Sequence, residues 1–426
     1  MRVLQVHKNF RLTGGADTFF FKTCDLLAEH GHEVAHFSTK HPQNCPSPFA
    51  DYFVEGFTEE GVNRLSLTRK TKAFFNGIYS FDAKEKLSQL LEDFKPDLVH
   101  AHSFNYQLSA SIFDVFRRSR VPLVVTLHDY HIVCGAGTLY VDGALCERCR
   151  GGRHFNLLRH SCYWNRPASL MATFSHYVHD ARHSWSVPSK LLSPSHFLQG
   201  KLIEFGIPAS SIAHVPIFID FSEEPVENKS TPEYVLYFGR LVQYKGIEVL
   251  LEAVKTLDCR LLLIGEGPLS GWVEEQCAIS GGRIKRIAFV SSREQLRQYI
   301  EQAAFSVVPS LWYENQPATI LETYAMGRPV IGSRLGGIPE LIDEEQTGLL
   351  CEAGNVADLA EKIRFLLERP ELCREWGRNG NRKLREGFSR ASHYDRLMAI
   401  YRTVLSNNQG FSALSRETFA VNHNED

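Results

Sequence analysis

Two glutamates that stand eight positions apart, Glu314 and Glu322, are the side chains whose type and spacing first suggest chemistry. A strand-like apolar run over residues 305–309 precedes the first glutamate, and the second lies near the start of a helical pattern. At such places in an open α/β sheet, side chains face the ligand crevice. Because ionised acceptors make strong hydrogen bonds, the pair could hold sugar or ribose hydroxyls. Isolated glutamates are more often exposed surface charges, so the interpretation depends on other motifs at matching places.

Glycines follow two further predicted strands. Gly14 and Gly15 separate the first strand from a helix, where backbone amides can approach an anion closely. Gly239 ends another strand, and Arg240 and Lys245 follow it on one loop, where both cations could neutralise a diphosphate. The alternatives are a tight strand–helix turn for the glycine pair and solvated cations for the loop.

A histidine and a second glycine pair complete the set. His128 directly follows a predicted strand, so it would face the crevice and exchange hydrogen bonds with a sugar hydroxyl. A lone histidine is more often structural. Gly336 and Gly337 follow the second glutamate. Their amides could hold phosphate oxygens together with the segment Glu314, Asn315, Gln316, Pro317 and Ala318.

The elements that must position these residues alternate between strands and helices in both halves of the chain. The predicted strands comprise residues 3–6, 32–37, 97–100, 122–127, 234–238, 260–264, 305–309 and 329–331. The predicted helices between them include residues 17–30 and 247–255. This alternation is typical of parallel, doubly wound α/β domains of the Rossmann-like kind.

The length of 426 residues exceeds what one ordinary core serves, so we expect more than one domain. An N-terminal domain over residues 1–214 would be followed by a polar linker over 215–232 and a C-terminal domain over 233–390. The last predicted elements are a bracing helix over residues 391–405 and a mobile polar tail over 406–426.

Taken in order, the motifs resemble those of the family 4 retaining glycosyltransferases (GT4), which have the GT-B fold. The resemblance covers nearly the whole chain and rests on Gly14-Gly15, His128, Gly239-Arg240 with Lys245-Gly246, Gly265-Glu266-Gly267-Pro268, Glu314-x7-Glu322 and Gly336 to Glu340. It implies two Rossmann-like domains that face each other across a cleft. The N-terminal domain would hold the acceptor, and the C-terminal domain would hold a nucleotide sugar.

The resemblance also implies a role for each matching residue. The catalytic set would be His128, Glu314, Arg240 and Lys245, with both cations on the donor diphosphate, Glu314 on the donor sugar and His128 near the 6-position of that sugar. Glu322 would bind the ribose. Gly14, Gly15 and Gly239 would lie by the phosphates, and the nucleobase near Gly265 and the strand around Phe289 and Val290. Because the chain has no Asp-x-Asp triplet, we expect no divalent metal in catalysis.

Three departures from the family pattern bear on the identity of the base and of the donor sugar. Residues 215–220 lack the Asn-Gly that the family usually has between its domains. Ala288 stands where a glycine is common, and Asn315-Gln316-Pro317 replaces the usual Gly-Phe-Gly after the first glutamate.

A cysteine-rich insertion is expected over residues 134–162. Cys134, Cys146, Cys149 and Cys162 form a C-x11-C-x2-C-x12-C pattern, a spacing that suits tetrahedral structural zinc. The segment is poor in core residues and therefore needs another source of order. Unconnected thiols and an iron–sulfur cluster are the alternatives, and His131, His154 or His160 could replace one thiol.

Since the pattern begins shortly after His128, we expect the insertion to shape the acceptor site or to gate the cleft. Five arginines around the cluster could meet an acceptor phosphate or lipid head groups, or be solvated: Arg148, Arg150, Arg153, Arg159 and Arg166.

The composition indicates a globular protein, with 43% hydrophobic and 23% charged residues. No apolar run approaches the roughly 18 residues of a spanning helix, and the start reads as a strand, so we expect a cytoplasmic location. Residues 1–214 carry 23 Lys and Arg against 19 Asp and Glu, which could favour peripheral contact with the inner face of an anionic membrane. Ordinary scatter of charges is the alternative. We expect no nucleic-acid partner.

Together these features predict a retaining transferase that moves a sugar from a nucleoside-diphosphate donor, with UDP or GDP, to a hydroxyl of a glycan or lipid-linked acceptor. Cell-surface polysaccharide biosynthesis is the setting that the family resemblance implies. One alternative is a GT-B nucleotide-sugar epimerase or hydrolase, which would need no acceptor. The other is a non-catalytic nucleotide-sugar-binding scaffold, which would turn over no donor.

Overall fold

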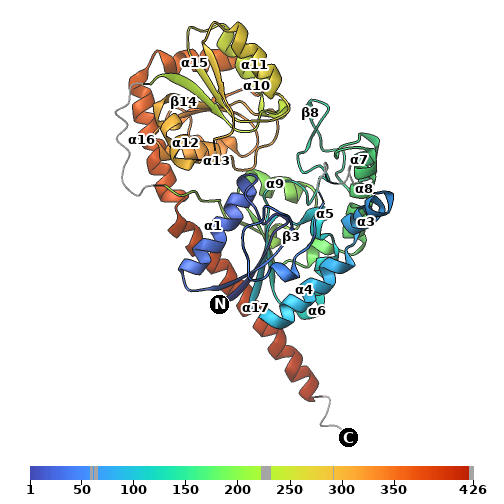
Figure 1. Cartoon of the computed structure of the whole chain (residues 1–426). Coiled ribbons are helices and arrows are strands. Elements are labelled where there is room, and N and C mark those ends of the chain that lie inside the picture. Colours follow the sequence, from blue (N-terminus) through green and yellow to red (C-terminus); the bar gives the residue numbers. More distant parts are fainter. Residues whose placement is uncertain (58–60, 62–65, 222–231, 291, 422–426) are drawn as a thin grey trace.

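Two parallel α/β domains make up the chain (Figure 1), in a computed structural model that describes residues 1–57, 61, 66–221, 232–290 and 292–421. Each domain is built on one six-stranded sheet. The N-terminal sheet has the strand order β10-β9-β6-β5-β1-β2, and the C-terminal sheet has the order β13-β12-β11-β14-β15-β16. Neighbouring strands in both sheets run parallel. The predicted pair of doubly wound domains is therefore confirmed.

The strands of the N-terminal sheet are β1 Arg2–Val6, β2 Glu33–Phe37, β5 Leu98–Ala101, β6 Leu123–Thr126, β9 Lys190–Ser193 and β10 Ile212–His214. Those of the C-terminal sheet are β11 Tyr234–Phe238, β12 Leu261–Ile264, β13 Ile284–Ile287, β14 Ala303–Val308, β15 Val330–Ser333 and β16 Gly348–Cys351. Two small ribbons pair β3 Thr39–Lys40 with β4 Val54–Glu55, and β7 Tyr140–Val141 with β8 Ala144–Leu145.

The helices of the first domain are α1 Gly15–Glu29, α3 Leu67–Ile78, α4 Phe81–Phe94, α5 Asn105–Leu108, α6 Ser111–Ser119, α7 Phe155–Arg159, α8 Arg166–Ala181 and α9 His196–Glu204. Those that follow are α10 Ile247–Lys255, α11 Ser270–Ile279, α12 Arg293–Gln302, α13 Ala318–Ala325, α14 Ile338–Leu341, α15 Val356–Leu367, α16 Pro370–Gly387 and α17 Arg390–Val421. Single 3-10 turns are η1 Ala50–Tyr52, η2 Ser184–Ser186, η3 Ala209–Ser211 and η4 Gln243–Lys245.

The central strands are apolar runs that are buried along their whole length. Every residue of β5, β6, β12, β14 and β15 is buried, because helices cover both faces of each sheet. The predicted strands lie within two residues of the observed ones, and β11 and α10 have the predicted bounds. The sequence did not predict β9, β10, β13 and β16, since each has only three or four residues and the first three carry a polar or charged side chain.

The C-terminal helix returns to the first domain. In α17, Leu397, Met398 and Tyr401 are buried against strand residues that include Val3 and Val124 of the N-terminal sheet. The helix packs on the first domain and extends to Val421, whereas the predicted bracing helix ends at residue 405. Alanine, leucine, arginine and glutamate within residues 413–420 favour helix, which explains the extension. Among the described residues, no helix combines the length and the apolar content needed to cross a bilayer.

The crossing of α16 over the turn that ends α13 requires a glycine. A Cβ atom at Gly377 would stand 1.9 Å from the carbonyl oxygen of Gly327, while a Cβ atom at Gly387 on the same helix would meet nothing within 4 Å. The neighbour of Gly377, Trp376, is buried in the core of the second domain. Backbone contact at this point therefore sets how closely α16 approaches the sheet.

We expect Gly377→Ala to lower the free energy of unfolding by about 1–3 kcal/mol, because the added methyl group overpacks a rigid backbone contact. Gly387→Ala is the matched control and should leave stability unchanged or raise it slightly, since alanine restricts the unfolded chain. Urea unfolding of both variants beside the wild type measures the difference. Equal stability of the two variants would contradict the packing described.

Candidate active site

Several of the predicted site residues lie where the strand order of each sheet reverses, whereas His128 follows β6, the strand beside β5. The N-terminal sheet reverses between β1 and β5, and the C-terminal sheet between β11 and β14. Ligands of such sheets bind outside the carboxyl ends of the strands at this place. The loop after β1 leads to Gly14 and Gly15, the loop after β11 carries Arg240 and Lys245, and the loop after β14 leads to Glu314. The structure thus brings the predicted motifs to the ligand-binding edges of the two sheets.

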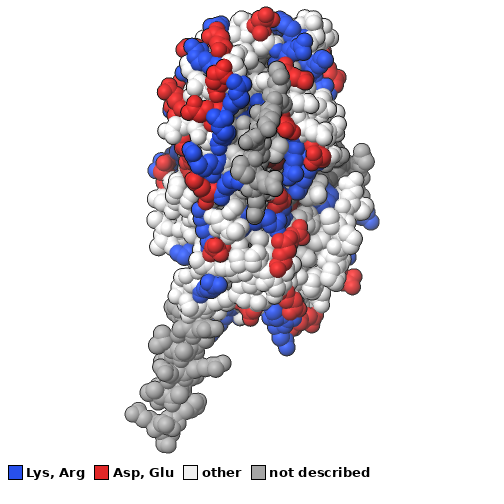
Figure 2. All heavy atoms as spheres, turned by 90° about the vertical axis from the view of Figure 1, so that its left-hand side faces the viewer, with Lys and Arg blue, Asp and Glu red and all other residues white. Residues whose placement is uncertain are grey.

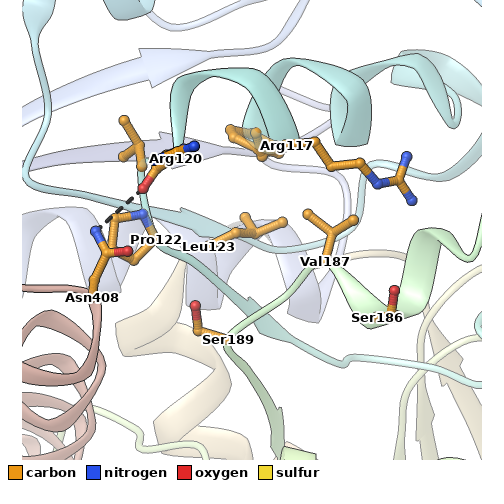
Figure 3. Close-up of a pocket in the computed structure, with 10 residues that line it drawn as sticks. Arg117, Arg120, Pro122, Leu123, Ser186, Val187, Ser189 and Asn408 are labelled. Carbon is orange, nitrogen blue, oxygen red and sulfur yellow. Dashed lines mark hydrogen bonds between the residues drawn. The ribbon is translucent and has the colours of Figure 1, made fainter. Parts of the chain in front are cut away.

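A cavity of about 550 Å³ lies at the opposite end of the N-terminal sheet (Figure 3). Pro122, Leu123 and Ser189 line it where β6 and β9 begin, and Asn408 of α17 closes one side by donating a hydrogen bond to the backbone oxygen of Arg120. Because ligand crevices of doubly wound sheets lie at the carboxyl ends, we assign the active site to the facing loops and not to this cavity.

The turn over residues 314–317 joins the two domains. The side-chain oxygen of Asn315 accepts a hydrogen bond from Ser195 Oγ at 2.7 Å, and its amide donates to the backbone oxygen of Leu127 at 3.2 Å. Gln316 makes two hydrogen bonds to Ile217 of the linker. Its side-chain oxygen accepts from the amide of Ile217 at 2.8 Å, and its side-chain nitrogen donates to the carbonyl of the same residue at 3.3 Å. These two side chains, predicted to bind the donor, are used here in contacts between the domains.

Glu314 is buried and neutralised by a lysine. Its Oε1 atom lies 2.5 Å from Lys245 Nζ and accepts a hydrogen bond from Ser310 Oγ at 2.6 Å. The lysine ammonium also stands 5.2 Å from the centre of the Trp312 ring. Arg240 on the same loop is exposed. The two predicted phosphate ligands therefore differ. Lys245 is paired with the carboxylate of Glu314, whereas Arg240 is open to solvent.

Glycines let the loops of the second domain approach each other closely. A Cβ atom at Gly265 would stand 1.9 Å from the oxygen of Gly239, and both residues have positive φ angles, +146° and +149°. Likewise, a Cβ atom at Gly337 would stand 1.9 Å from the oxygen of Asn315. The amide of Gly337 donates to the carbonyl of Glu314 at 2.7 Å, so this amide holds the turn and is not left for a phosphate.

Unlike Gly265 and Gly337, Gly14 and Gly15 are not required for close backbone contact within the protein. Gly14 is extended, with a φ of −176°, and a Cβ atom at either glycine would meet nothing within 4 Å. Neither glycine relieves backbone strain or a clash in the protein itself. Their small size leaves open space in front of the N-terminus of α1, as a close approach by an anion requires.

Glu322 lies on α13 at the junction of the domains. Burial raises its pKa to about 7, although the charges of Lys22, Arg293 and Arg297 lower it in part. Lys22 comes from α1 of the first domain and pairs with Asp220 of the linker at 3.0 Å. A carboxylate that is partly protonated near neutral pH and lies among three cations is suited to accept hydrogen bonds from a ligand diol.

His128 is held in a buried chain of polar side chains. Its Nε2 atom lies 3.0 Å from Nδ1 of His102, whose Nε2 atom lies 3.0 Å from Oε1 of Gln5. The rings of His102 and His128 are stacked, with centroids 5.3 Å apart. Burial lowers the pKa of His128 to about 4, so the imidazole is neutral at physiological pH. It can exchange hydrogen bonds with a hydroxyl, but it carries no charge there.

Sequence reasoning missed a carboxylate that orders the glycine-rich loop. Asp17, in the first turn of α1, accepts hydrogen bonds from His7 Nε2 at 2.7 Å and from the amide of Thr13 at 3.0 Å. Burial alone would raise the pKa of Asp17, but the bonds from His7, Thr13 and Asn9 hold it below its ordinary value. An aspartate two positions after the glycine pair, at the start of a helix, was the available signal.

The remaining residues predicted to contact the donor lie at the start of a helix and in a loop. Pro317 is the N-cap of α13 and Ala318 begins it. The region expected to be a strand around Phe289 and Val290 lies beyond β13, which ends at Ile287. Residues 288–290 lie outside any strand and Phe289 is 72% exposed, so the segment expected to contact the base is a loop. Alternation of apolar residues was too weak there to fix the strand end.

The four predicted metal ligands lie together. Cys134, Cys146, Cys149 and Cys162 line one small cavity, and each is a free cysteine. Burial raises the pKa of Cys149 to about 12 and that of Cys162 to about 11. Within the described ranges, however, no three or more His, Cys, Asp or Glu side chains have an arrangement that could hold a metal ion.

The cysteine-rich insertion reaches the second domain. Tyr140 of β7 lies against Tyr244, with ring centroids 6.1 Å apart, next to Lys245 of the donor loop. Glu147 pairs with Lys201 at 2.8 Å and accepts a hydrogen bond from Tyr313 at 3.4 Å. The cysteine-rich segment therefore contacts the second domain at Tyr244 and Tyr313.

The two halves of the chain match two family models. Residues 13–223 match the model described as Glycosyltransferase Family 4, and residues 232–369 match the one described as Glycosyl transferases group 1. N-acetyl-alpha-D-glucosaminyl L-malate synthase of Bacillus anthracis is 22% identical over 402 residues, which cover 92% of this chain and 94% of that protein. An uncharacterized glycosyltransferase of Methanocaldococcus jannaschii is 30% identical over 166 residues, 39% of this chain and about half (47%) of that protein.

Solved structures share the fold. Sucrose-phosphate synthase from Thermosynechococcus elongatus superposes with a TM-score of 0.69 at 20% identity, covering 95% of this chain and 99% of that one. Anabaena Alr3699/HepE in complex with UDP-glucose has a TM-score of 0.63 at 16% identity, covering 95% and 100%. The expected GT-B fold is confirmed, and at these identities the likeness extends to the fold alone.

The raised pKa of Glu322 predicts how stability depends on pH. The folded chain binds this proton more tightly than the unfolded chain, so the stability from neutral Glu322 is complete below its unfolded pKa and is lost as pH rises through about 7. We expect Glu322→Gln to be more stable than the wild type by about 1–3 kcal/mol near pH 8, with the gap closing toward about pH 5. Urea unfolding of both proteins across this range measures the gap, and a gap independent of pH would show that the carboxyl group titrates normally.

Proposed function

The chain belongs to the family 4 glycosyltransferases, and on that premise we propose that it transfers a sugar, with retention of anomeric configuration, from a nucleoside-diphosphate sugar to a hydroxyl of a glycan or lipid-linked acceptor. The observation that carries the proposal is the cross-domain turn over residues 314–317. This turn sets Glu314 and the loop of Arg240 and Lys245 opposite the strand end that carries His128. Work at the inner face of the membrane, in cell-surface polysaccharide assembly, is the proposed setting.

The donor is proposed to be a UDP- or GDP-sugar. Arg240 is exposed and Lys245 is half-buried, so both ammonium and guanidinium groups can reach a diphosphate at the carboxyl end of β11. Glu322 would accept hydrogen bonds from the ribose diol. A neighbour of the same fold has been solved with UDP-glucose, which supports this donor class.

The proposed chemistry is a substitution on one face of the sugar. The bond between the anomeric carbon and the diphosphate oxygen breaks while the acceptor oxygen bonds to the same face, and the departing phosphate takes the acceptor proton. Before the donor binds, Glu314 accepts hydrogen bonds from Lys245 and Ser310, and this route requires no protein nucleophile. Arg240, Lys245 and nearby amides would stabilise the leaving diphosphate without a divalent ion.

Nucleotide release from a panel of UDP-, GDP- and ADP-sugars tests the proposal. We expect slow release from one donor in the wild type and at least about a tenfold loss in Glu322→Ala, because the ribose would lose a charged hydrogen-bond acceptor. Glu361→Ala on the exposed side of α15 is the matched control and should keep full activity. EDTA should not change the rate.

Two results would redirect the proposal. Turnover that is complete without any acceptor and continues to free sugar or to an epimer would favour the epimerase or hydrolase. Absence of binding and turnover across the panel would favour the scaffold.

We further propose that the four thiols bind structural zinc. They line a single cavity within a segment that has few core residues, and zinc would draw the sulfurs inward to tetrahedral distance. The bound metal would order the insertion that contacts Tyr244 and Tyr313 across the cleft. Its chemistry would be structural, since all four ligands come from the protein.

Metal analysis of the purified chain tests this site. We expect about one zinc per chain in the wild type and in Cys277→Ser, whose sulfur lies in the other domain, and almost none in Cys149→Ser. Zinc loss should also lower the thermal midpoint, because metal binding contributes to folding free energy. A wild type that contains no zinc and has the same thermal midpoint as Cys149→Ser would exclude the zinc site.

A further inference from the structure

We propose that one face of the N-terminal domain docks on an anionic lipid surface. This docking face consists of the exposed side chains of residues 67–75 on α3 and of residues 153–177 on and around α7 and α8. The inference rests on the proposed function, since a lipid-linked acceptor would be met at a membrane. The three helices lie together on one side of the domain (Figure 1).

Large apolar side chains are exposed on all three helices. Leu67 and Phe75 on α3 are 80% and 62% exposed, and Phe155, Phe174 and Tyr177 on α7 and α8 are 50%, 50% and 40% exposed. The amide of Phe155 donates to Tyr177 Oη at 3.2 Å, so these two rings are neighbours. Single exposed apolar residues are ordinary, but a group on one face indicates an interaction surface.

The same face carries cations without carboxylate partners. Residues 66–78 and 148–166 contain no Asp or Glu. Arg69, Lys70 and Lys72 on α3, and Arg153, Arg159 and Arg166 around α7 and α8, form no ion pair with any carboxylate of the described chain. On the opposite side of the molecule, by contrast, positive and negative side chains are interspersed (Figure 2).

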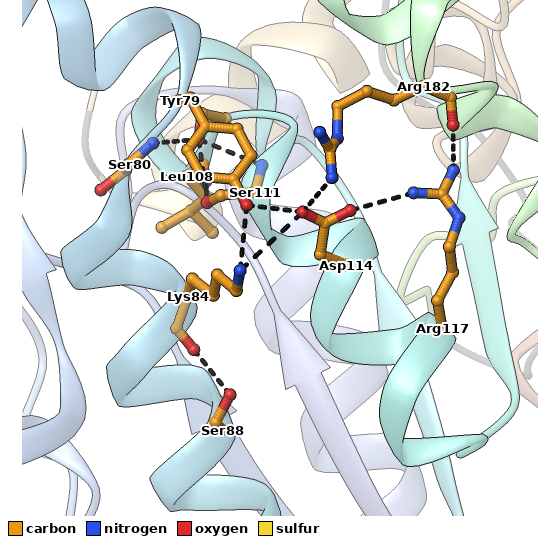
Figure 4. A network of polar contacts seen from close by, with 10 residues as sticks. Tyr79, Ser80, Lys84, Ser88, Leu108, Ser111, Asp114, Arg117 and Arg182 are labelled. Atoms are coloured by element: carbon orange, nitrogen blue, oxygen red, sulfur yellow. Dashed lines mark hydrogen bonds and ion pairs between the residues drawn. The ribbon is translucent and has the colours of Figure 1, made fainter.

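The helices of the docking face share a small core and are tied firmly to the domain. Phe74 of α3, Leu157 of α7 and Met171 of α8 pack in one cluster. Beneath them, Asp114 of α6 accepts hydrogen bonds from Tyr79 Oη at 2.5 Å and from Arg182 at 2.5 Å (Figure 4). The rings and cations are therefore presented on a fixed platform.

Aromatic rings beside unpaired cations suit an anionic bilayer. Aromatic side chains prefer the membrane interface, and each Lys or Arg near an anionic surface adds about 1 kcal/mol of attraction. Binding of a protein surface to a bilayer grows with the apolar area that it buries and with its attraction to anionic lipids, and this face offers both. Docking here would leave the C-terminal domain toward solution, where a soluble nucleotide sugar is available (Figure 1).

Sedimentation of the full chain with vesicles tests the inference. Wild type should pellet with vesicles of phosphatidylglycerol and phosphatidylcholine, but little with phosphatidylcholine alone, and high salt should release it. The double variant Arg69→Glu/Lys72→Glu should weaken the partition coefficient by roughly tenfold or more. Phe75→Ser and Arg159→Glu/Arg166→Glu, on the other elements of the face, should also weaken it.

The matched control is Arg378→Glu/Arg382→Glu, which reverses two exposed cations on α16 of the other domain and should bind like the wild type. Failure of the wild type to pellet with the anionic vesicles, or equal loss in the control, would overturn the assignment of this face. Nucleotide release without vesicles should be unchanged in Arg69→Glu/Lys72→Glu. That readout separates failure of docking from failure of the proposed transferase activity.

Discussion

The contact between the turn at residues 314–317 and the first domain is the constraint on which the site depends. Asn315 bonds to the carbonyl of Leu127, the residue before His128, while its neighbour Glu314 bonds to Lys245. Asn315 thus reaches the first domain, while the adjacent Glu314 holds Lys245 within the second domain. The donor loop and the histidine are positioned relative to each other by one polar side chain, with Ser195 as its second partner.

Other cross-domain contacts reinforce the same arrangement. Glu340 of α14 accepts hydrogen bonds from the amides of His196 and Phe197, at 2.8 and 2.6 Å, and so caps the N-terminus of α9 from the opposite domain. A carboxylate is favourable at this end of a helix. The Asn-Gln-Pro sequence that departs from the family pattern therefore has a physical use, since glycine and phenylalanine could not make the Asn315 and Gln316 bonds. A diphosphate bound at this place would compete with Glu314 for the ammonium group of Lys245.

The sequence predicted eight of the twelve sheet strands, which are mostly buried apolar runs between turns, and missed the short strands β9, β10, β13 and β16. It also predicted Glu314, Glu322, Lys245 and His128 as site residues, since each follows a strand or lies near the start of a helix, and these roles stay predictions. It did not predict that Asn315 and Gln316 join the domains, because such contacts depend on how the two sheets face each other. The role of Asp17 was missed for a similar reason: its partners His7 and Thr13 converge only when the loop folds back on α1.

The central claim is that the loop of Arg240 and Lys245 binds a donor diphosphate beside the cross-domain turn. A crystal structure of the chain with UDP or GDP tests it most directly. We expect the diphosphate against Arg240 and Lys245, with the lysine ammonium moved from Glu314 to a phosphate oxygen and the ribose on Glu322. A nucleotide bound elsewhere, or one bound here while Lys245 stays paired with Glu314 and neither cation touches phosphate, would contradict it.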